Sequence, residues 1–205
     1  MICSLCCRSG KLFFKEDFFL CPHCSGIFRN RNNLPSQEDE KKRYEQHNND
    51  INDPRYQQFV SPITHYVLDN FSTESAGLDF GAGNGSAISK ILKDNHYRID
   101  QYDPFFFNNK QMLELTYDYI VCCEVIEHFH HPDQEFKRLY QMLNPQGELI
   151  CMTHLYGSSI SFDQWYYKND RTHVFFYQEA TIEYIAKEFG FTSYEVKDRL
   201  IVWRK

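Results

Sequence analysis

The segment 122–132, CCEVIEHFHHP, gathers side chains that can do chemistry. Glu124, Glu127 and His128 stand at positions i, i+3 and i+4, so a helix here would stack all three on one face. Two carboxylates beside an imidazole can bind a divalent cation or move a proton. The simpler interpretation is a helix N-terminus, where the positive end of the helix dipole stabilises acidic residues. Both interpretations stay open at this point.

Four cysteines near the start of the chain form a second chemical pattern. Two CxxC pairs, with fourteen residues between them, can present four thiolates to one tetrahedral zinc ion: Cys3, Cys6, Cys21 and Cys24. The aromatic stretch between the pairs, KLFFKEDFFLC, is typical of the short hairpin of a zinc ribbon. A module this small buries little apolar surface, so the metal would supply its folding energy. Disulfides are disfavoured in a reducing compartment, and unrelated cysteines rarely form two matched pairs. We expect a structural zinc ribbon at residues 1–34.

Length and composition predict a globular protein with one domain and a small appendage. The chain has 205 residues, of which 42% are hydrophobic, and this is enough for a packed core. No apolar run approaches the roughly 20 residues that cross a bilayer, and cysteines interrupt the start where a signal peptide needs an apolar stretch. We expect a cytoplasmic protein with no membrane partner.

The charge of the chain is uneven. A net charge of −6 disfavours a wholly basic nucleic-acid binder, but residues 1–34 hold five basic and two acidic side chains. A nucleic-acid or protein contact would therefore start at the ribbon.

Residues 35–70 predict a helical linker. Ser36 and Asp39 are spaced as a capping box before a charged helix that should end near 47–49. A second helix should run from Pro54 to Asn70, with an apolar stripe along one side.

From residue 76 onward, apolar strands alternate with helices of about ten residues. The pattern predicts parallel strands at 76–80, 97–102, 118–123 and 147–153, helices at 86–94, 134–143 and 178–190, and an antiparallel terminal pair at 192–197 and 199–204. It is typical of a doubly wound, mostly parallel α/β domain over residues 71–205, with its ligand crevice at the carboxyl ends of the strands. We expect this domain to have a core separate from that of the ribbon.

The glycine turn after the first of these strands indicates a nucleotide-like ligand. In LDFGAGNG, residues 78–85, the glycines allow positive φ and leave room for a ligand against the backbone. The spacing is not the dinucleotide fingerprint, and no GKS or GKT follows, so a P-loop is excluded. Together with Asp79 and with Asp103 at the end of the second strand, the turn resembles the first two motifs of class I S-adenosylmethionine-dependent methyltransferases. The resemblance extends from about residue 54 to the C-terminus.

The resemblance implies a cofactor site. The acidic residue before the turn and the turn itself would face the methionine end of S-adenosylmethionine, Asp103 would bind both ribose hydroxyls, and Phe105 would lie near the adenine. Cys123 and Glu124 would border the methionine and the reacting methyl. The implied cofactor-binding residues are Asp79, Gly81, Ala82, Gly83, Gly85, Asp103, Phe105, Cys123 and Glu124. Only about fourteen residues separate Asp103 from the next strand, so the sheet is expected to lack one strand of the family pattern.

The acidic run also has a resemblance. EVIEH is similar to a pattern in quinone-biosynthesis O-methyltransferases and in small-RNA 3′-end 2′-O-methyltransferases, and the latter hold a divalent cation with Glu-x-x-Glu-His and a later histidine. Here His173 stands in the corresponding place. The resemblance implies a second metal on Glu124, Glu127, His128 and His173, and the same four are the candidate catalytic residues. His173 is the first candidate for the general base, with His128 and His154 behind it. The alternative is that the acids only cap a helix.

The segment 154–177 is long, aromatic and polar, and we expect it to be an acceptor-binding lid. Trp165, Tyr166 and Tyr167 are candidates for stacking on a planar acceptor, although aromatic clusters are as often core. The block WYYKNDRTHVFFY is similar to a bacterial group of zinc-ribbon methyltransferases of unassigned acceptor.

The sequence therefore predicts an S-adenosylmethionine-dependent methyltransferase that methylates a hydroxyl of a small molecule or of a terminal ribose. The alternative is an RNA methyltransferase, of ribosomal or small RNA, that the zinc ribbon targets. A non-catalytic cofactor-binding protein is a distant third. The acidic catalytic domain favours the first hypothesis, and the basic ribbon permits the second.

Overall fold

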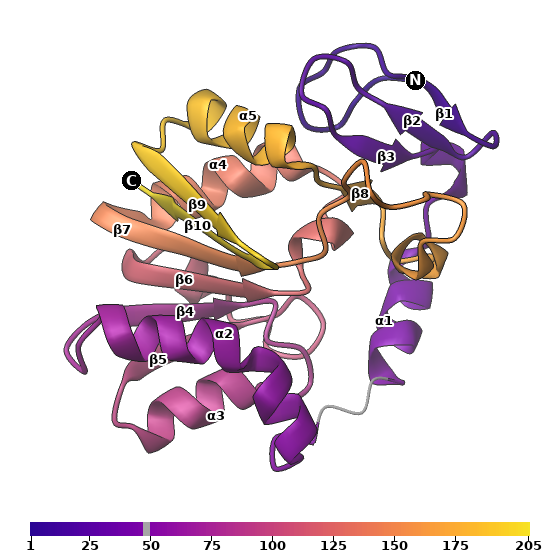
Figure 1. Cartoon of the computed structure of the whole chain (residues 1–205). Helices are drawn as coiled ribbons and strands as arrows, with labels where there is room; N and C mark the ends of the chain where they lie inside the picture. Colours follow the sequence, from indigo (N-terminus) through magenta and orange to yellow (C-terminus); the bar gives the residue numbers. More distant parts are fainter. Residues whose placement is uncertain (47–49) are drawn as a thin grey trace.

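The computed structural model describes residues 1–46 and 50–205, and its centre is a six-stranded sheet (Figure 1). The strand order is β5-β4-β6-β7-β10-β9. Four strands are parallel, and the two from the C-terminus are antiparallel: β4 (Ala76–Phe80), β5 (Arg98–Tyr102), β6 (Tyr117–Cys123) and β7 (Leu143–Met152), then β9 (Ser193–Lys197) and β10 (Leu200–Arg204). The predicted doubly wound α/β architecture and the antiparallel terminal pair are confirmed.

Helices cover both faces of the sheet because side chains alternate along its strands. Tyr119 and Val121 of β6 pack with α2 (Pro54–Asn70) and α3 (Ala87–Asp94). Ile120, between them, packs with α4 (Pro132–Met142) and α5 (Glu179–Phe189) on the opposite face. None of the helices in the described ranges is long and apolar enough to cross a membrane.

Local signals explain where these helices begin and end. Asp53 caps α2 and Pro54 occupies its first turn, where a missing N–H costs nothing. Gly190 ends α5 in the left-handed conformation, with φ of 88°. In the linker, Ser36 accepts the Asp39 N–H at the start of α1 (Gln37–Glu45). The predicted end of that helix near 47–49 lies outside the described residues.

Within the described ranges, no strand lies beyond β5 in the sheet, as the short spacing after Asp103 predicts. Residues 103–116 contain a short 3₁₀ helix, η2 (Lys110–Leu113), and no strand, so β5 forms the edge of the sheet.

A second, smaller sheet contains the ribbon. Its order is β1-β2-β3-β8, with β1 (Lys11–Phe14), β2 (Phe18–Leu20), β3 (Ile27–Arg29) and β8 (Phe175–Phe176). The predicted hairpin is β1–β2, whereas β8 comes from the predicted acceptor lid. Figure 1 shows the ribbon strands lying next to β8, beside the part of the chain that contains the large sheet.

The expectation of a separate ribbon core is wrong. One continuous hydrophobic cluster contains Cys3, Cys24 and Phe28 of the ribbon together with Phe175 and residues of the large sheet. The reason is the β3–β8 pairing, which carries aromatic side chains from the lid into the ribbon. The boundaries 1–34, 35–70 and 71–205 remain a prediction.

Candidate active site

The glycine turn after β4 has the backbone conformation that the cofactor prediction needs. Gly81 and Gly83 have positive φ, 82° and 62°, which glycine adopts without strain. A Cβ on Gly81 would come within 2.5 Å of Val125 Cγ2, so the turn touches the segment that follows β6. Ser86 then caps α3 by accepting the Ser89 N–H at 3.1 Å. The turn therefore connects β4 to the start of α3 and contacts the segment that follows β6.

Asp79 supports this turn from inside the fold. Its carboxylate is 2% exposed and accepts the hydroxyls of Ser86 and Ser89, the latter at 2.7 Å. Burial raises the pKa of this carboxyl. Because both donors belong to the start of α3, Asp79 fixes the turn and does not border open space. Any effect on the methionine end of the cofactor would act through the turn, and direct contact stays a prediction.

Asp103 joins the end of β5 to the glycine turn. Its carboxylate accepts three backbone N–H groups, from Gly83 at 3.0 Å, Phe105 at 2.8 Å and Phe106 at 3.1 Å. The Phe105 ring lies 5.7 Å from the ring of Tyr44 in α1, between centroids. Asp103 and Phe105 therefore lie beside the turn as the resemblance implies, while their contacts to ribose and adenine stay predictions.

The acidic run is not one helix, so the expectation of a shared helix face is wrong. β6 ends at Cys123, and Glu124 has a positive φ of 52°, which turns the chain out of the sheet. A 3₁₀ turn, η3, covers only Ile126–His128, and α4 begins at Pro132. Positive φ at a residue other than glycine is strained, and such residues cluster at functional sites.

The four predicted residues nevertheless converge. One ligand atom from each of Glu127, His128 and His173 lies within 4.8 Å of the others. Glu124 joins them through Tyr167, whose hydroxyl lies 3.1 Å from Glu124 Oε2 and also bonds Glu127 Oε1. Helix capping does not explain this arrangement, because the fully buried Glu127 faces a side-chain cluster. Their roles as ligands or as acid and base stay predictions.

Two residues that the sequence analysis missed hold the carboxylates. Thr153, directly after β7, donates its hydroxyl to Glu127 Oε2 at 3.0 Å and lies 2.9 Å from the Tyr167 hydroxyl. Arg199, in the β9–β10 turn, forms an ion pair with Glu124 Oε1. Neither belongs to a motif, although the strand-end position of Thr153 is a signal for a site residue.

Backbone carbonyls fix the tautomer of both histidines. His128 Nδ1 lies 2.8 Å from Thr172 O, and His173 Nδ1 lies 2.7 Å from Tyr167 O. A carbonyl can only accept, so in each neutral ring the proton sits on Nδ1 and the lone pair on Nε2. Metal-binding histidines commonly have this arrangement.

Burial sets the charge state of the cluster. Burial, together with the Glu127 charge, raises the pKa of Glu124 to about 7, and burial raises the pKa of Glu127 to about 7. Burial also lowers the pKa of His128, and burial with the neighbouring His128 lowers the pKa of His173 to about 3. Near pH 7 the site therefore offers two neutral imidazoles beside a carboxyl pair that holds protons more strongly than ordinary carboxyls do.

Of the three aromatic candidates for acceptor stacking, the structure leaves one exposed. Trp165 is 6% exposed and packs against Tyr156, Phe162 and Phe176. Tyr167 is 4% exposed, whereas Tyr166 is 64% exposed and places its hydroxyl 2.9 Å from His154 Nε2. Trp165 and the Tyr167 ring are core, and stacking on an acceptor stays a prediction for Tyr166.

A cavity of about 830 Å³ opens beside this cluster. Side chains from α1, α2, the segment 166–173 and the β9–β10 turn line it, among them Arg43, Phe59, Tyr166, His173 and Arg199. The cavity has a mixed aromatic and charged lining and room for a small molecule or a nucleoside.

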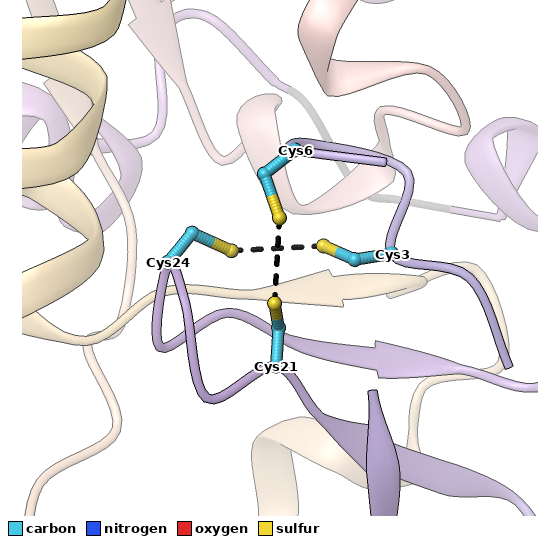
Figure 2. Close-up of side chains that lie close together, drawn as sticks. All are labelled: Cys3, Cys6, Cys21 and Cys24. Atoms are coloured by element: carbon cyan, nitrogen blue, oxygen red, sulfur yellow. Dashed lines mark hydrogen bonds between the residues drawn. The ribbon is translucent and has the colours of Figure 1, made fainter. Parts of the chain in front are cut away.

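The four ribbon cysteines fit a tetrahedral zinc ion. Figure 2 shows their side chains pointing toward one centre. Their sulfur atoms lie within 4.8 Å of one another, with Cys3–Cys24 at 3.6 Å and Cys6–Cys21 at 3.3 Å. Four thiolates at about 2.3 Å from zinc stand roughly 3.8 Å apart, whereas a disulfide needs about 2.05 Å. The donor set thus fits zinc, which stays a proposal.

Comparison with protein families decides the class. Residues 53–196 match a family model described as a methyltransferase domain. The chain belongs to this methyltransferase family. The predicted doubly wound α/β fold, which is the Rossmann-like fold of methyltransferases, and the prediction of an S-adenosylmethionine-dependent methyltransferase enzyme are thereby confirmed.

Solved structures share the fold of this methyltransferase at low sequence identity. An O-methyltransferase family protein from Burkholderia thailandensis aligns with TM-score 0.57 and 10% identity, over 85% of this chain and 64% of the other. Phosphoethanolamine N-methyltransferase 2 from Haemonchus contortus, in complex with phosphomonomethylethanolamine and S-adenosylhomocysteine, aligns with TM-score 0.59 and 19% identity, over 82% and 46%. A 1,6-didemethyltoxoflavin-N1-methyltransferase from Burkholderia thailandensis aligns with TM-score 0.55 and 16% identity, over 82% and 86%.

The methyltransferase spans less than two thirds of the first two of these proteins. No curated protein matches the chain. Because the neighbours include both O- and N-methyltransferases, the fold leaves the acceptor open.

Proposed function

We propose that this enzyme methylates a hydroxyl group of an acceptor that binds in the cavity beside Glu127, His128 and His173. The observation that carries the proposal is the convergence of these three side chains next to the end of β6. In the class I resemblance, this strand end borders the reacting methyl. S-adenosylmethionine supplies that methyl group, and the protein contributes the alignment of the acceptor oxygen with it.

The same three residues suit a divalent cation. The Nε2 lone pairs of the two histidines and a carboxylate oxygen of Glu127 would form a donor set that leaves positions for further ligands. The Tyr167 hydroxyl links Glu124 to this set, because it contacts both glutamates. A bound cation lowers the pKa of a coordinated hydroxyl, which is the chemistry that an O-methyltransferase needs. The carboxyl pair, whose pKa values burial raises to about 7, can accept the acceptor's proton. The lowered pKa of His173 makes its neutral imidazole better suited to binding the cation than to taking a proton.

The remaining residues divide between cofactor, acceptor and structure. Asp103, Phe105 and the glycine turn would hold the cofactor, with Ala82, Gly85 and Cys123 around it. Tyr166 would contact the acceptor. Cys3, Cys6, Cys21 and Cys24 would hold a structural zinc ion, in keeping with the resemblance to zinc-ribbon methyltransferases. A cytoplasmic location also stays a prediction.

Methyl transfer into fractionated cell extract tests the acceptor class. Tritiated S-adenosylmethionine with added Mn²⁺ should label the small-molecule or RNA pool, and the labelled atom should be an ether oxygen by mass spectrometry. Glu127→Gln should abolish labelling while leaving cofactor affinity by calorimetry unchanged, because the Glu127 carboxylate bonds Thr153 and Tyr167 rather than the glycine turn. Glu183→Gln, on the exposed face of α5, is the matched control. Equal labelling by Glu127→Gln and wild type would overturn the proposal.

The second candidate is an RNA methyltransferase targeted by the ribbon. One observation favours it, since four basic side chains of residues 1–34 are exposed: Arg8, Lys11, Lys15 and Arg31. Label confined to the RNA pool, and lost at high salt, would support this candidate over a small-molecule acceptor.

A further inference from the structure

The zinc ribbon holds the segment that carries His173. The residues of β8 pair with β3 in an antiparallel ladder, and the Arg29 N–H donates to Val174 O at 2.9 Å. Gly26 marks the closest approach, because a Cβ there would come within 2.3 Å of the Phe175 ring. The backbone of the ribbon is therefore bonded one residue away from His173.

The Arg29 side chain adds a second connection to the same segment. It is 9% exposed, and its Nε donates to His173 O at 3.3 Å. Its Nη2 donates to Lys168 O at 3.0 Å and to Asp170 O at 3.3 Å, while Nη1 pairs with Asp17 of the ribbon. One planar guanidinium thus binds three carbonyls of the turn 168–173, and Asp17 balances its charge.

The opposite side of this turn faces the carboxylate cluster. The Val174 N–H donates to Glu127 O at 2.9 Å, and the His173 ring bonds Tyr167 O within the turn. We propose that the ribbon orients the active site, with Arg29 as the positioning residue that sets the His173 ring against Glu127 and His128. The inference rests on the proposed function for the importance of His173, and it gives the ribbon a role inside the enzyme besides any docking role.

Replacement of Arg29 tests the inference in the full-length protein. Arg29→Lys keeps a positive charge beside Asp17 but cannot bind three carbonyls in one plane. In ¹⁵N-histidine NMR, the Nδ1–H of His173 should exchange with water at least 10-fold faster in this variant than in wild type. Mn²⁺ affinity should fall about 10- to 100-fold, as is typical when a residue behind a metal ligand is lost. Zinc content and cofactor affinity should stay unchanged, because neither site contacts this turn.

Arg31→Ala is the matched control, since Arg31 is an exposed arginine just after β3. It should leave the His173 ring proton and the Mn²⁺ affinity unchanged. A His173 ring proton that exchanges as slowly in Arg29→Lys as in wild type would overturn the inference. Should Arg29→Ala lose its zinc and unfold, Arg29→Lys still decides. If the wild type binds no Mn²⁺, the cation proposal fails, while the ring proton still reports whether Arg29 positions His173.

Discussion

Replacing Tyr167 with phenylalanine probes the carboxylate cluster directly, because it deletes one oxygen and keeps the buried ring. The hydroxyl contacts Glu127 Oε1, lies 3.1 Å from Glu124 Oε2 and lies 2.9 Å from Thr153 Oγ1. Its single proton serves one acceptor at a time, and Thr153 keeps its own bond to Glu127. Above pH 7, where the carboxyl pair is ionised, the loss is therefore one hydrogen bond to a charged group, and the free energy of unfolding should fall by about 1.5–3 kcal/mol.

Urea unfolding without added divalent cation measures this change, as a lower midpoint at an unchanged slope. Tyr166→Phe is the matched control, because it makes the same substitution at the neighbouring residue, where the hydroxyl is exposed and bonds only His154 among the described contacts. Its free energy of unfolding should change by less than about 0.5 kcal/mol. Equal midpoints for the two variants would show that the Tyr167 hydroxyl does not hold the carboxylates together.

Three further predictions concern the cofactor, the zinc and the pH. Asp103→Ala should weaken S-adenosylmethionine binding in calorimetry by at least one charge-assisted hydrogen bond, about 1.5–3 kcal/mol. The control Asp100→Ala, on the exposed side of β5, should bind the cofactor as wild type does. Equal affinities of Asp103→Ala and wild type would remove the ribose assignment. Chelating zinc should speed hydrogen exchange at the Val174 amide as well as in the ribbon, because the segment around β8 shares a hydrophobic core with the ribbon. Unchanged protection of the Val174 amide would contradict the shared core. Burial holds the pKa of His173 at about 3, against about 6.5 when unfolded, so the stability this group contributes is complete above pH 6.5 and is lost as pH falls. The raised pKa values of Glu124 and Glu127 act in the opposite direction in both proteins, so the readout is the difference between them: in thermal melts from pH 7.5 to 5, wild type should lose more stability, or gain less, than His173→Gln.

Regular elements could be predicted from the sequence because each has a local cause. The predicted strand at 118–123 is apolar from residue 119 to residue 123, and the matched CxxC pairs constrain four cysteines to one centre. The shared helix face expected for Glu124, Glu127 and His128 does not form, because i, i+3, i+4 spacing says nothing about φ and Glu124 has a positive φ.

Contacts between residues far apart in the sequence could not be predicted, because they have no local sequence pattern. β3 and β8 lie far apart in the chain, and two-residue β8 is too short to show a strand period. For the same reason, neither Thr153 nor Arg199 could be assigned to the carboxylates from spacing alone. Trp165 illustrates a different limit, since composition cannot tell an aromatic residue that stacks on a ligand from one that packs in a core.

A site built on a long loop is usually less well defined than one built on strands and helices. The segment that carries His173 overcomes this problem by bonding on two sides, to β3 through backbone pairing and to Glu127 through the Val174 N–H. Arg29 then binds the turn before it, so the position of the imidazole depends on the ribbon as well as on the large sheet. A ribbon that served only as a docking module would need neither a shared core nor a buried arginine aimed at the active-site turn. The physical arrangement therefore supports the proposal that the ribbon positions the turn carrying His173 and does not serve only for docking.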